Sequence, residues 1–254
     1  MQIRVIERGF LFTTAMANMS HDRLKTNSRR LLVTQPFCNT EIKGNANLKS
    51  ISLVPNQKTP QLQAEFTAKL ADGSDISETH YCPYGVPGDR LYIRETYYQY
   101  GGWQKVKGML TKKGQKGKWR FVPAAPEILF EPPKNYRRGR RVADGETKAW
   151  YKRSARFMPK DASRTMLEII DIQLERLQDI SEKDAAAEGV IKIEHKWRDI
   201  EYPLPNVAYM ASAESTIKYS SAKDAFKALW ESIYGAGSWG VPAWVWVVKF
   251  SRVD

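Results

Sequence analysis

The chain has 254 residues, of which 42% are hydrophobic and 27% are charged, a balance typical of a soluble globular protein. No apolar run reaches the roughly 18 residues that a membrane helix needs, so no membrane helix is expected. Arg4, Glu7 and Arg8 interrupt the first segment, so no secretory signal is expected there. The two cysteines, Cys38 and Cys82, favour a reducing compartment, so we expect a cytoplasmic protein and leave a single disulfide open.

The positive charge is concentrated in one segment. The formal net charge is +12, from 40 Lys and Arg against 28 Asp and Glu. Between Lys105 and Arg156 there are 16 Lys and Arg and 4 Asp and Glu, and subtracting these from the totals leaves 24 of each elsewhere. A concentrated basic segment predicts attraction to polyanions such as nucleic acid.

The N-terminal third predicts a strand, a short helix and a hairpin. Residues 3–12 read as a strand, and a helix is expected over residues 15–24, although its apolar spacing is irregular. Residues 50–70 alternate weakly, which predicts a hairpin with its turn at Pro55-Asn56 or at Ala71-Asp72-Gly73.

The stretch "CPYGVPGDRLYIRETYY" predicts a turn and a strand. The turn is Pro87-Gly88-Asp89, and the strand runs over residues 90–97. Because strand side chains alternate, Leu91, Ile93 and Glu95 should share one face. Tyr92, Arg94 and Thr96 should then share the other.

The basic segment itself has no clear period. Residues 101–157 combine Lys, Arg and Gly with interspersed aromatic residues, and four prolines break regular structure. We interpret it as a long insertion, part hairpin and part loop. Two interpretations fit this composition: a solvated, charged loop, or a surface that binds nucleic acid. The aromatic residues favour the nucleic-acid surface, because bases stack on aromatic rings while Lys and Arg bind phosphates.

The C-terminal half is the most regular part. Residues 163–178 predict a strand, and Ser181 with Asp184 predicts the start of a short helix that ends at Gly189. Residues 191–219 have no period and form a second insertion. Ser221 and Asp224 repeat the capping signal, and the helix that follows has an apolar face of Ala225, Phe226, Leu229, Trp230 and Ile233. A buried strand is expected over residues 243–250. The four tryptophans near this end, Trp230, Trp239, Trp244 and Trp246, favour core packing.

This element order predicts an α+β fold. No glycine-rich phosphate loop is present, which argues against nucleotide-triphosphate enzymes and dinucleotide oxidoreductases, so no cofactor is expected. The three histidines are isolated and no Cys/His spacing suits zinc, so no metal is expected either.

Four segments carry a resemblance to a known family. In "LKTNSRR" Lys25 and Arg30 match a Gly-x-Lys-x-x-(Glu or Thr)-x-Arg signature, with Arg23 at the usual glycine and Ser28 at the variable polar position. The others are "CPYGVPGDRLYIRET", "ASRTMLEIIDIQLERLQDISEKDAAAEGV" and "FKALWESIYGAGSW" with "PAWVWVVKF". Together they span the chain, which resembles ASCH domain proteins of the PUA-like superfamily, and more narrowly the phage- and prophage-encoded group.

The resemblance implies one domain over residues 1–254, a curved β-barrel with flanking helices and large insertions at about 101–157 and 191–219. It implies a cleft that binds RNA, another nucleic acid or a modified nucleobase. One branch, the N4-acetylcytidine amidohydrolases, uses a Lys, a Thr and a Glu. Carried over by motif, these fall on Lys25, Ser28 and Glu188.

These three residues could be catalytic, or they could have only binding and structural roles. On a helical turn, Lys25 and Ser28 would share a face at i and i+3. A desolvated lysine could take the serine proton, and Glu188 could position water or protonate the leaving amine. Alternatively Lys25 binds only phosphate, Ser28 bonds the backbone, and Glu188 pairs with Arg30 or Arg94 or ends a helix.

Further binding residues are proposed from sequence. Arg30, Tyr84, Arg94 and Glu95 are candidate ligand contacts, Tyr84 because a loop before a Gly-Pro turn should lie near the surface. The candidate nucleic-acid contacts are Lys112, Lys113, Lys116, Lys118, Arg137, Arg138, Arg140 and Arg141. The competing functions are nucleic-acid binding, an amidohydrolase acting on an acylated nucleobase, a ribonuclease without a His pair, and a phage protein that acts through a protein partner.

Overall fold

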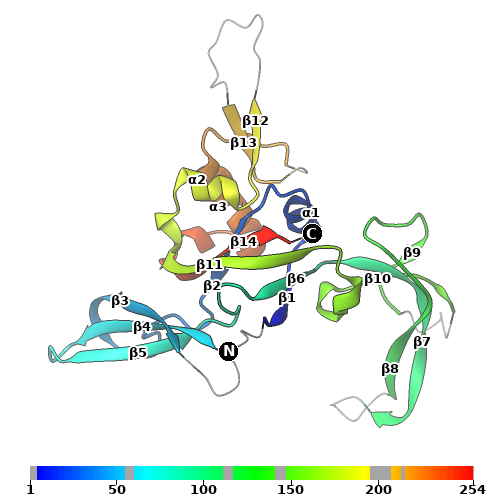
Figure 1. Ribbon diagram of the computed structural model, residues 1–254, viewed down its shortest axis with the longest axis horizontal. Helices are drawn as coiled ribbons and strands as arrows, with labels where there is room; N and C mark the ends of the chain where they lie inside the picture. The colour runs from blue at the N-terminus through cyan, green and yellow to red at the C-terminus, as the bar shows by residue number, and fades with distance from the viewer. Residues whose placement is uncertain are drawn as a thin grey trace, which may run out of the picture. The chain divides into compact units, whose positions relative to one another are not determined.

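The computed structural model describes residues 5–54, 60–110, 117–140, 147–194, 207–212 and 215–253. Strands dominate the described residues and helices are few, so the α+β prediction is confirmed (Figure 1). The helices are α1 (Thr14–His21), α2 (Glu182–Ala187) and α3 (Ala222–Tyr234). The strands are β1 (Glu7–Leu11), β2 (Asn27–Leu31), β3 (Ile42–Val54), β4 (Gln61–Leu70), β5 (Asp75–Tyr81), β6 (Arg90–Arg94), β7 (Tyr97–Leu110), β8 (Gly117–Leu129), β9 (Tyr136–Arg137), β10 (Ala149–Arg153), β11 (Met166–Arg176), β12 (Ile191–Glu194), β13 (Val207–Met210) and β14 (Trp244–Arg252).

The chain divides into two compact units. The first unit consists of residues 1–10, 18–92 and 165–254, and the second of residues 11–17 and 93–164. The second unit contains the whole of the predicted basic insertion. The prediction of a single domain over the full chain stays a prediction.

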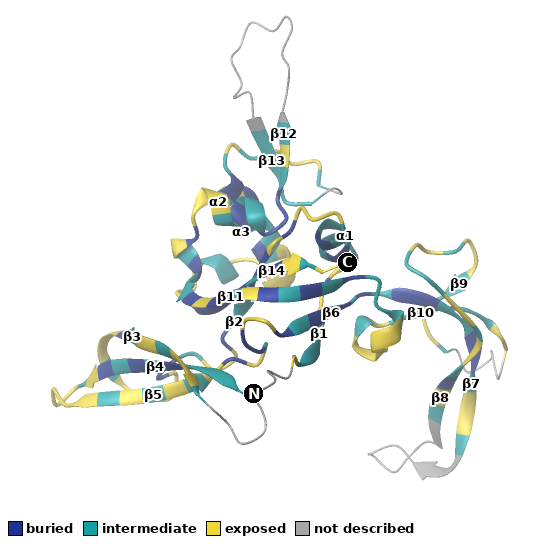
Figure 2. Cartoon of the chain, viewed as in Figure 1, coloured by how far each residue is buried: buried dark blue, intermediate teal, exposed yellow. Residues whose placement is uncertain are grey.

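The main sheet, β1-β6-β11-β14-β2, is built on two apolar strands. Strand β14 has five consecutive buried residues from Trp244 to Val248, as expected of a short apolar run in a core. It pairs with β11 over nearly its whole length, and β11 alternates between buried and more exposed residues (Figure 2). Among the described residues β1 and β2 are the edges of this sheet, so its ladder does not close into a barrel.

Helices α2 and α3 cover a core formed with β14. Both begin as predicted, because the hydroxyls of Ser181 and Ser221 accept the backbone N–H of the residue three positions on. The core contains Leu177, Ile180, Ala185, Val190, Ala222, Ala225, Phe226, Trp230, Val245 and Val247. Three of the four tryptophans are buried and Trp239 packs against this core, so the packing interpretation is confirmed. The expectation for Ile233 is wrong, since it lies at the exposed end of α3.

A smaller sheet, β3-β4-β5, replaces the single predicted hairpin. The chain reverses between Val54 and Gln61, and again after Leu70, whose backbone N–H donates to Ser74. The sequence offered two turn positions as alternatives, and the chain turns near both. Pro55 and Asn56 themselves lie outside the described residues.

The second unit contains the sheet β8-β7-β10-β9. Pro123 and Pro126 lie within β8, although proline was expected to break regular structure here. Strand β8 is an edge strand, where a residue without an N–H group is tolerated. The core of this unit is aromatic: the rings of Trp103, Phe121 and Tyr151 meet edge to face with centroids 5.5–6.3 Å apart.

The second predicted insertion contains regular structure that its sequence does not reveal. Strand β12 pairs with β13 from Ile191 opposite Met210 to Glu194 opposite Val207. No helix among the described residues is long and apolar enough to cross a membrane. Cys38 and Cys82 are both free thiols.

Candidate functional site

The segment "LKTNSRR" lies where α1 leads into β2. The helix ends in a tight turn, in which the backbone N–H groups of Leu24 and Lys25 both donate to Met19 O. From Asn27 the chain pairs with β14, which places Ser28 opposite Val248. The expected helical turn through Lys25 and Ser28 is therefore wrong, because sheet pairing overrides the local polar sequence.

Lys25 is enclosed by protein. Its side chain is 0% exposed, and its Nζ donates to the backbone oxygen of Glu188 at 2.6 Å and to Glu188 Oε2 at 2.8 Å. Glu188 caps the C-terminus of α2, and Gly189 follows with a φ of 94°. A Cβ on Gly189 would lie 3.3 Å from Met19 Sδ and 3.4 Å from the Lys25 side chain, so only glycine fits here without adjustment.

Arg29 extends this pair into a chain of four charges. Its Nη1 donates to Glu188 Oε1 at 3.0 Å, and its Nε donates to Glu175 Oε1 at 2.9 Å. Lys25, Glu188, Arg29 and Glu175 form what we call the Lys25 network. Only Glu175, with a side chain 27% exposed, brings it to the surface. Arg29 and Glu175 were not predicted as site residues. Glu175 lies on the predicted strand over residues 163–178, whereas no strand was predicted around Arg29.

The electrostatics of the network lower the pKa of Lys25. Burial lowers the pKa of Lys25, the Glu188 carboxylate opposes this, and Arg30 and Arg29 lower the pKa further. Ser28 is also buried, in β2. Lys25 and Glu188 thus form a buried pair, with Glu188 bound to Lys25 and Arg29. Arg29 and Ser28 are adjacent on β2, so their side chains lie on opposite faces of the strand. A ligand reaches Lys25 only if neighbouring atoms move.

Arg30 and Tyr84 lie together in the first unit with Phe10. The Arg30 guanidinium carbon is 4.3 Å from the Phe10 ring centroid, and the Phe10 and Tyr84 rings meet edge to face at 5.5 Å. Burial raises the pKa of Tyr84 to about 12, with Arg30 opposing, and burial also raises the pKa of Tyr234. Tyr84 is half-buried rather than displayed on the surface.

Arg94 and Glu95 belong to the second unit, where both make hydrogen bonds within that unit. Arg94 Nε donates to Ala155 O at 3.2 Å. Glu95 is 1% exposed and accepts from Arg164 Nε at 2.8 Å and from Nη2 at 2.9 Å. Glu95 is therefore a matched buried charge. Leu91, Ile93 and Glu95 are all buried, in keeping with the expectation that they share one face. The Lys25 network, by contrast, is built wholly from the first unit.

Three of the eight proposed nucleic-acid contacts can be placed with their side chains. The guanidinium carbon of Arg140 is 4.1 Å from a ring centroid of Trp119, that of Arg137 is 6.0 Å from Tyr151, and Arg138 is exposed. Lys112, Lys113, Lys116 and Arg141 lie outside the described residues, and only the backbone of Lys118 is described, in β8.

Comparison with known proteins identifies no relative. No family model, no curated protein and no solved structure matches the chain. Within the described residues no group of three or more His, Cys, Asp or Glu side chains could hold a metal ion.

Proposed function

We propose that this chain is a nucleic-acid-binding protein of the ASCH type, with its basic second unit as the main contact. The observation that carries the proposal is the charge of residues 105–156, where 16 Lys and Arg stand against 4 Asp and Glu. In the described part of this segment some of the cations lie against aromatic rings, as Arg140 does on Trp119 and Arg153 on Phe121 at 4.2 Å. Cations neutralise phosphates, and rings accept unpaired bases.

Two features of the first unit support the family part of the proposal. Arg23, at the position where the family signature has glycine, has a φ of 60°, a conformation that glycine adopts most readily. Lys25 and Glu188, which the resemblance pairs across 163 residues, are hydrogen-bonded. We propose a PUA-like arrangement of the main sheet on the same grounds.

Salt-dependent binding tests the nucleic-acid proposal. Short single- and double-stranded RNA and DNA would be titrated at several salt concentrations. For each phosphate that the protein no longer neutralises, the slope of log K against log salt should fall by about 0.7–0.9. Replacing the exposed second-unit cations Arg138 and Lys152 by Gln should therefore flatten the slope. The matched control replaces exposed Lys183 and Lys227 of the first unit by Gln, with the same change in net charge.

The outcomes are distinct. Binding that weakens steeply with salt, and more so in the second-unit variant than in the control, supports the proposal. An absence of binding to all four nucleic acids sinks it. Equal effects of the two variants would show that net charge, rather than the second unit, produces the binding.

A second candidate function is an amidohydrolase acting on N4-acetylcytidine. The observation in its favour is the enclosed Lys25, whose pKa burial lowers and which is hydrogen-bonded to Glu188; Ser28, three residues further along the chain, is also buried. In this mechanism Ser28 Oγ attacks the acetyl carbonyl and Lys25 takes the hydroxyl proton. Lys25 passes this proton through the Glu188 carboxylate to the departing cytidine amine, and water then hydrolyses the acetyl ester on Ser28, which releases acetate and restores the hydroxyl.

Turnover tests this candidate directly. Release of cytidine from N4-acetylcytidine would be followed for wild type, Lys25→Ala, Ser28→Ala and Glu188→Gln, with unfolding curves to identify variants that fail to fold. Folded variants should be slowed at least about a hundredfold, the usual scale of general acid–base catalysis. Turnover by Lys25→Ala and Glu188→Gln at the wild-type rate contradicts the mechanism.

A further inference from the structure

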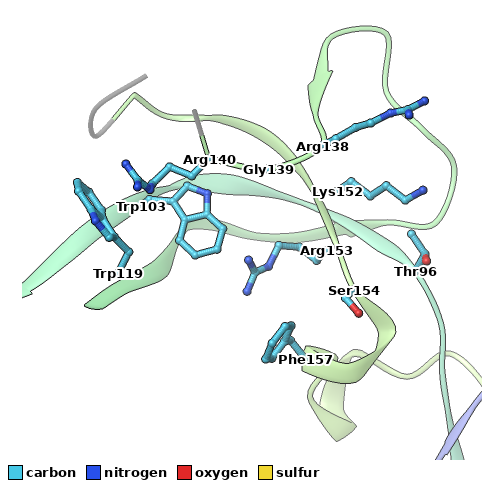
Figure 3. Close-up of a pocket in the computed structure, with 10 residues that line it drawn as sticks. All are labelled: Thr96, Trp103, Trp119, Arg138, Gly139, Arg140, Lys152, Arg153, Ser154 and Phe157. Carbon is cyan, nitrogen blue, oxygen red and sulfur yellow. The ribbon is translucent and has the colours of Figure 1, made fainter. Parts of the chain in front are cut away.

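The second unit contains a pocket unrelated to the Lys25 network. Its volume is about 550 Å³, within the usual range for small-ligand sites. It lies between β7, β8, β10 and the turn that follows β10 (Figure 3). The lining residues are Thr96, Trp103, Trp119, Arg138, Gly139, Arg140, Lys152, Arg153, Ser154 and Phe157. We call it the aromatic–cationic pocket.

The lining combines positive charge with aromatic rings. Arg138, Arg140, Lys152 and Arg153 are cations, and none of the ten lining residues carries a carboxylate. The side chain of Arg153 extends between Trp103 and Phe157 (Figure 3). Its guanidinium carbon is 5.1 Å and 5.9 Å from their ring centroids. Stacking on the rings holds the guanidinium in place without neutralising it.

Two donors in this lining have unused hydrogen-bonding capacity. Trp103 Nε1 and Arg153 Nε are enclosed and have no hydrogen-bond partner among the described residues. Enclosed donors without acceptors are rare, because desolvation then goes uncompensated. A ligand that brings acceptor oxygens, as phosphate does, suits the four cations of this lining.

Phe157 supplies an apolar surface at the mouth. It is 66% exposed, although the surrounding turn is well ordered by hydrogen bonds: Ser154 caps it, and Phe157 O accepts from Tyr97 Oη at 3.1 Å. A positioned, exposed ring beside cations provides the two contacts that a nucleotide needs, a stacking face and a phosphate partner. An acidic peptide would use the cations but not the ring face.

We infer that the aromatic–cationic pocket is a nucleotide subsite for single-stranded nucleic acid. One base stacks on Phe157, and its phosphate binds among Arg138, Arg140 and Lys152. Paired bases within a duplex are already stacked on their neighbours, so the pocket selects single strands. This inference rests on the proposed nucleic-acid function and names the site and the strandedness within it.

The test separates the contribution of the bases to binding from that of the sugar–phosphate backbone. A labelled single-stranded oligonucleotide of about ten residues, an abasic oligonucleotide of the same length and a duplex would be titrated against the full chain. Phe157→Ala removes only an exposed ring and keeps the backbone bond from Tyr97. Tyr81→Ala is the matched control, since Tyr81 is 56% exposed in β5 of the first unit. Phe157→Trp should restore stacking.

We expect Phe157→Ala to weaken binding of the base-bearing strand roughly five- to a hundredfold, from the usual strength of base stacking. Abasic and duplex binding, wild-type melting and the Tyr81→Ala protein should be unaffected, and Phe157→Trp should bind like wild type. If the chain binds single strands in a salt-dependent manner but Phe157→Ala binds them like wild type, the subsite is wrong and the proposed function stands. If neither strand type binds to wild type, both proposals fall.

Discussion

Replacing Glu188 by Gln isolates the energetics of the Lys25 network. The carboxylate accepts from Lys25 Nζ at 2.8 Å and from Arg29 Nη1 at 3.0 Å, and all three side chains are at most 3% exposed. Removing one partner of a buried ion pair typically costs about 3–5 kcal/mol, because the other charge stays buried and uncompensated. Arg29 keeps Glu175, so we expect about 3 kcal/mol, with Lys25 as the main source.

The destabilisation should depend on pH. Burial lowers the pKa of Lys25 below its ordinary 10.5, and Glu188 opposes that effect, so the variant's Lys25 has a lower pKa still. Between that lowered pKa and 10.5 the unfolded chain binds more protons than the folded chain. Stability of the variant therefore rises with pH over this window, and the full destabilisation is seen below it.

Urea unfolding at several pH values, followed by tryptophan fluorescence, measures the effect. The double variant Lys25→Met with Glu188→Gln should be more stable than Glu188→Gln alone, because no unmatched lysine is then buried. A Glu188→Gln protein within about 1 kcal/mol of wild type at neutral pH would refute the reasoning. A double variant less stable than the single one would also refute it.

Three further substitutions test other features. Arg164→Ala should destabilise the second unit by about 3 kcal/mol, because it leaves Glu95 buried without its two hydrogen bonds, and a melting temperature equal to wild type would contradict this. Gly189→Ala should cost at least about 1 kcal/mol in thermal unfolding, since φ is 94° and the added Cβ meets Lys25; unchanged stability would show that this turn adapts. Arg23→Gly should stabilise by up to about 1 kcal/mol in urea, with Thr26→Gly as the control, and a destabilised protein would mean that the Arg23 side chain outweighs its backbone strain.

Local signals in the sequence were reliable where the physics is local. The hydroxyls of Ser181 and Ser221 cap helices because a serine oxygen can reach a backbone N–H three residues on. Strands β11 and β14 could be predicted from their apolar runs, because such runs are stable only when they are buried in a core. Strand β2 gave no such signal, since "NSRRL" is polar and is a strand only because β14 offers it backbone partners.

The candidate site depends on contacts that sequence spacing does not encode. Lys25 and Glu188 are 163 residues apart, and only the family resemblance suggested that they belong together. Arg29 and Glu175 could not be predicted, because a charged residue on a strand gives no sign of whether it faces solvent or a buried partner. In the basic segment the mixture of rings and cations predicted a stacking surface, but not that Arg153 and Phe157 would form part of it.

The enclosure of Lys25 sets a kinetic condition on anything it does. A lysine with no exposed side-chain surface reacts with an amine-modifying reagent only when the segment between α1 and β2 opens away from the end of α2. The rate at which Lys25 becomes labelled, compared with the rate for exposed Lys183, therefore measures how often this opening occurs. A substrate of the Lys25 amine needs the same opening, so the opening rate sets an upper limit on the turnover of any reaction that uses this amine.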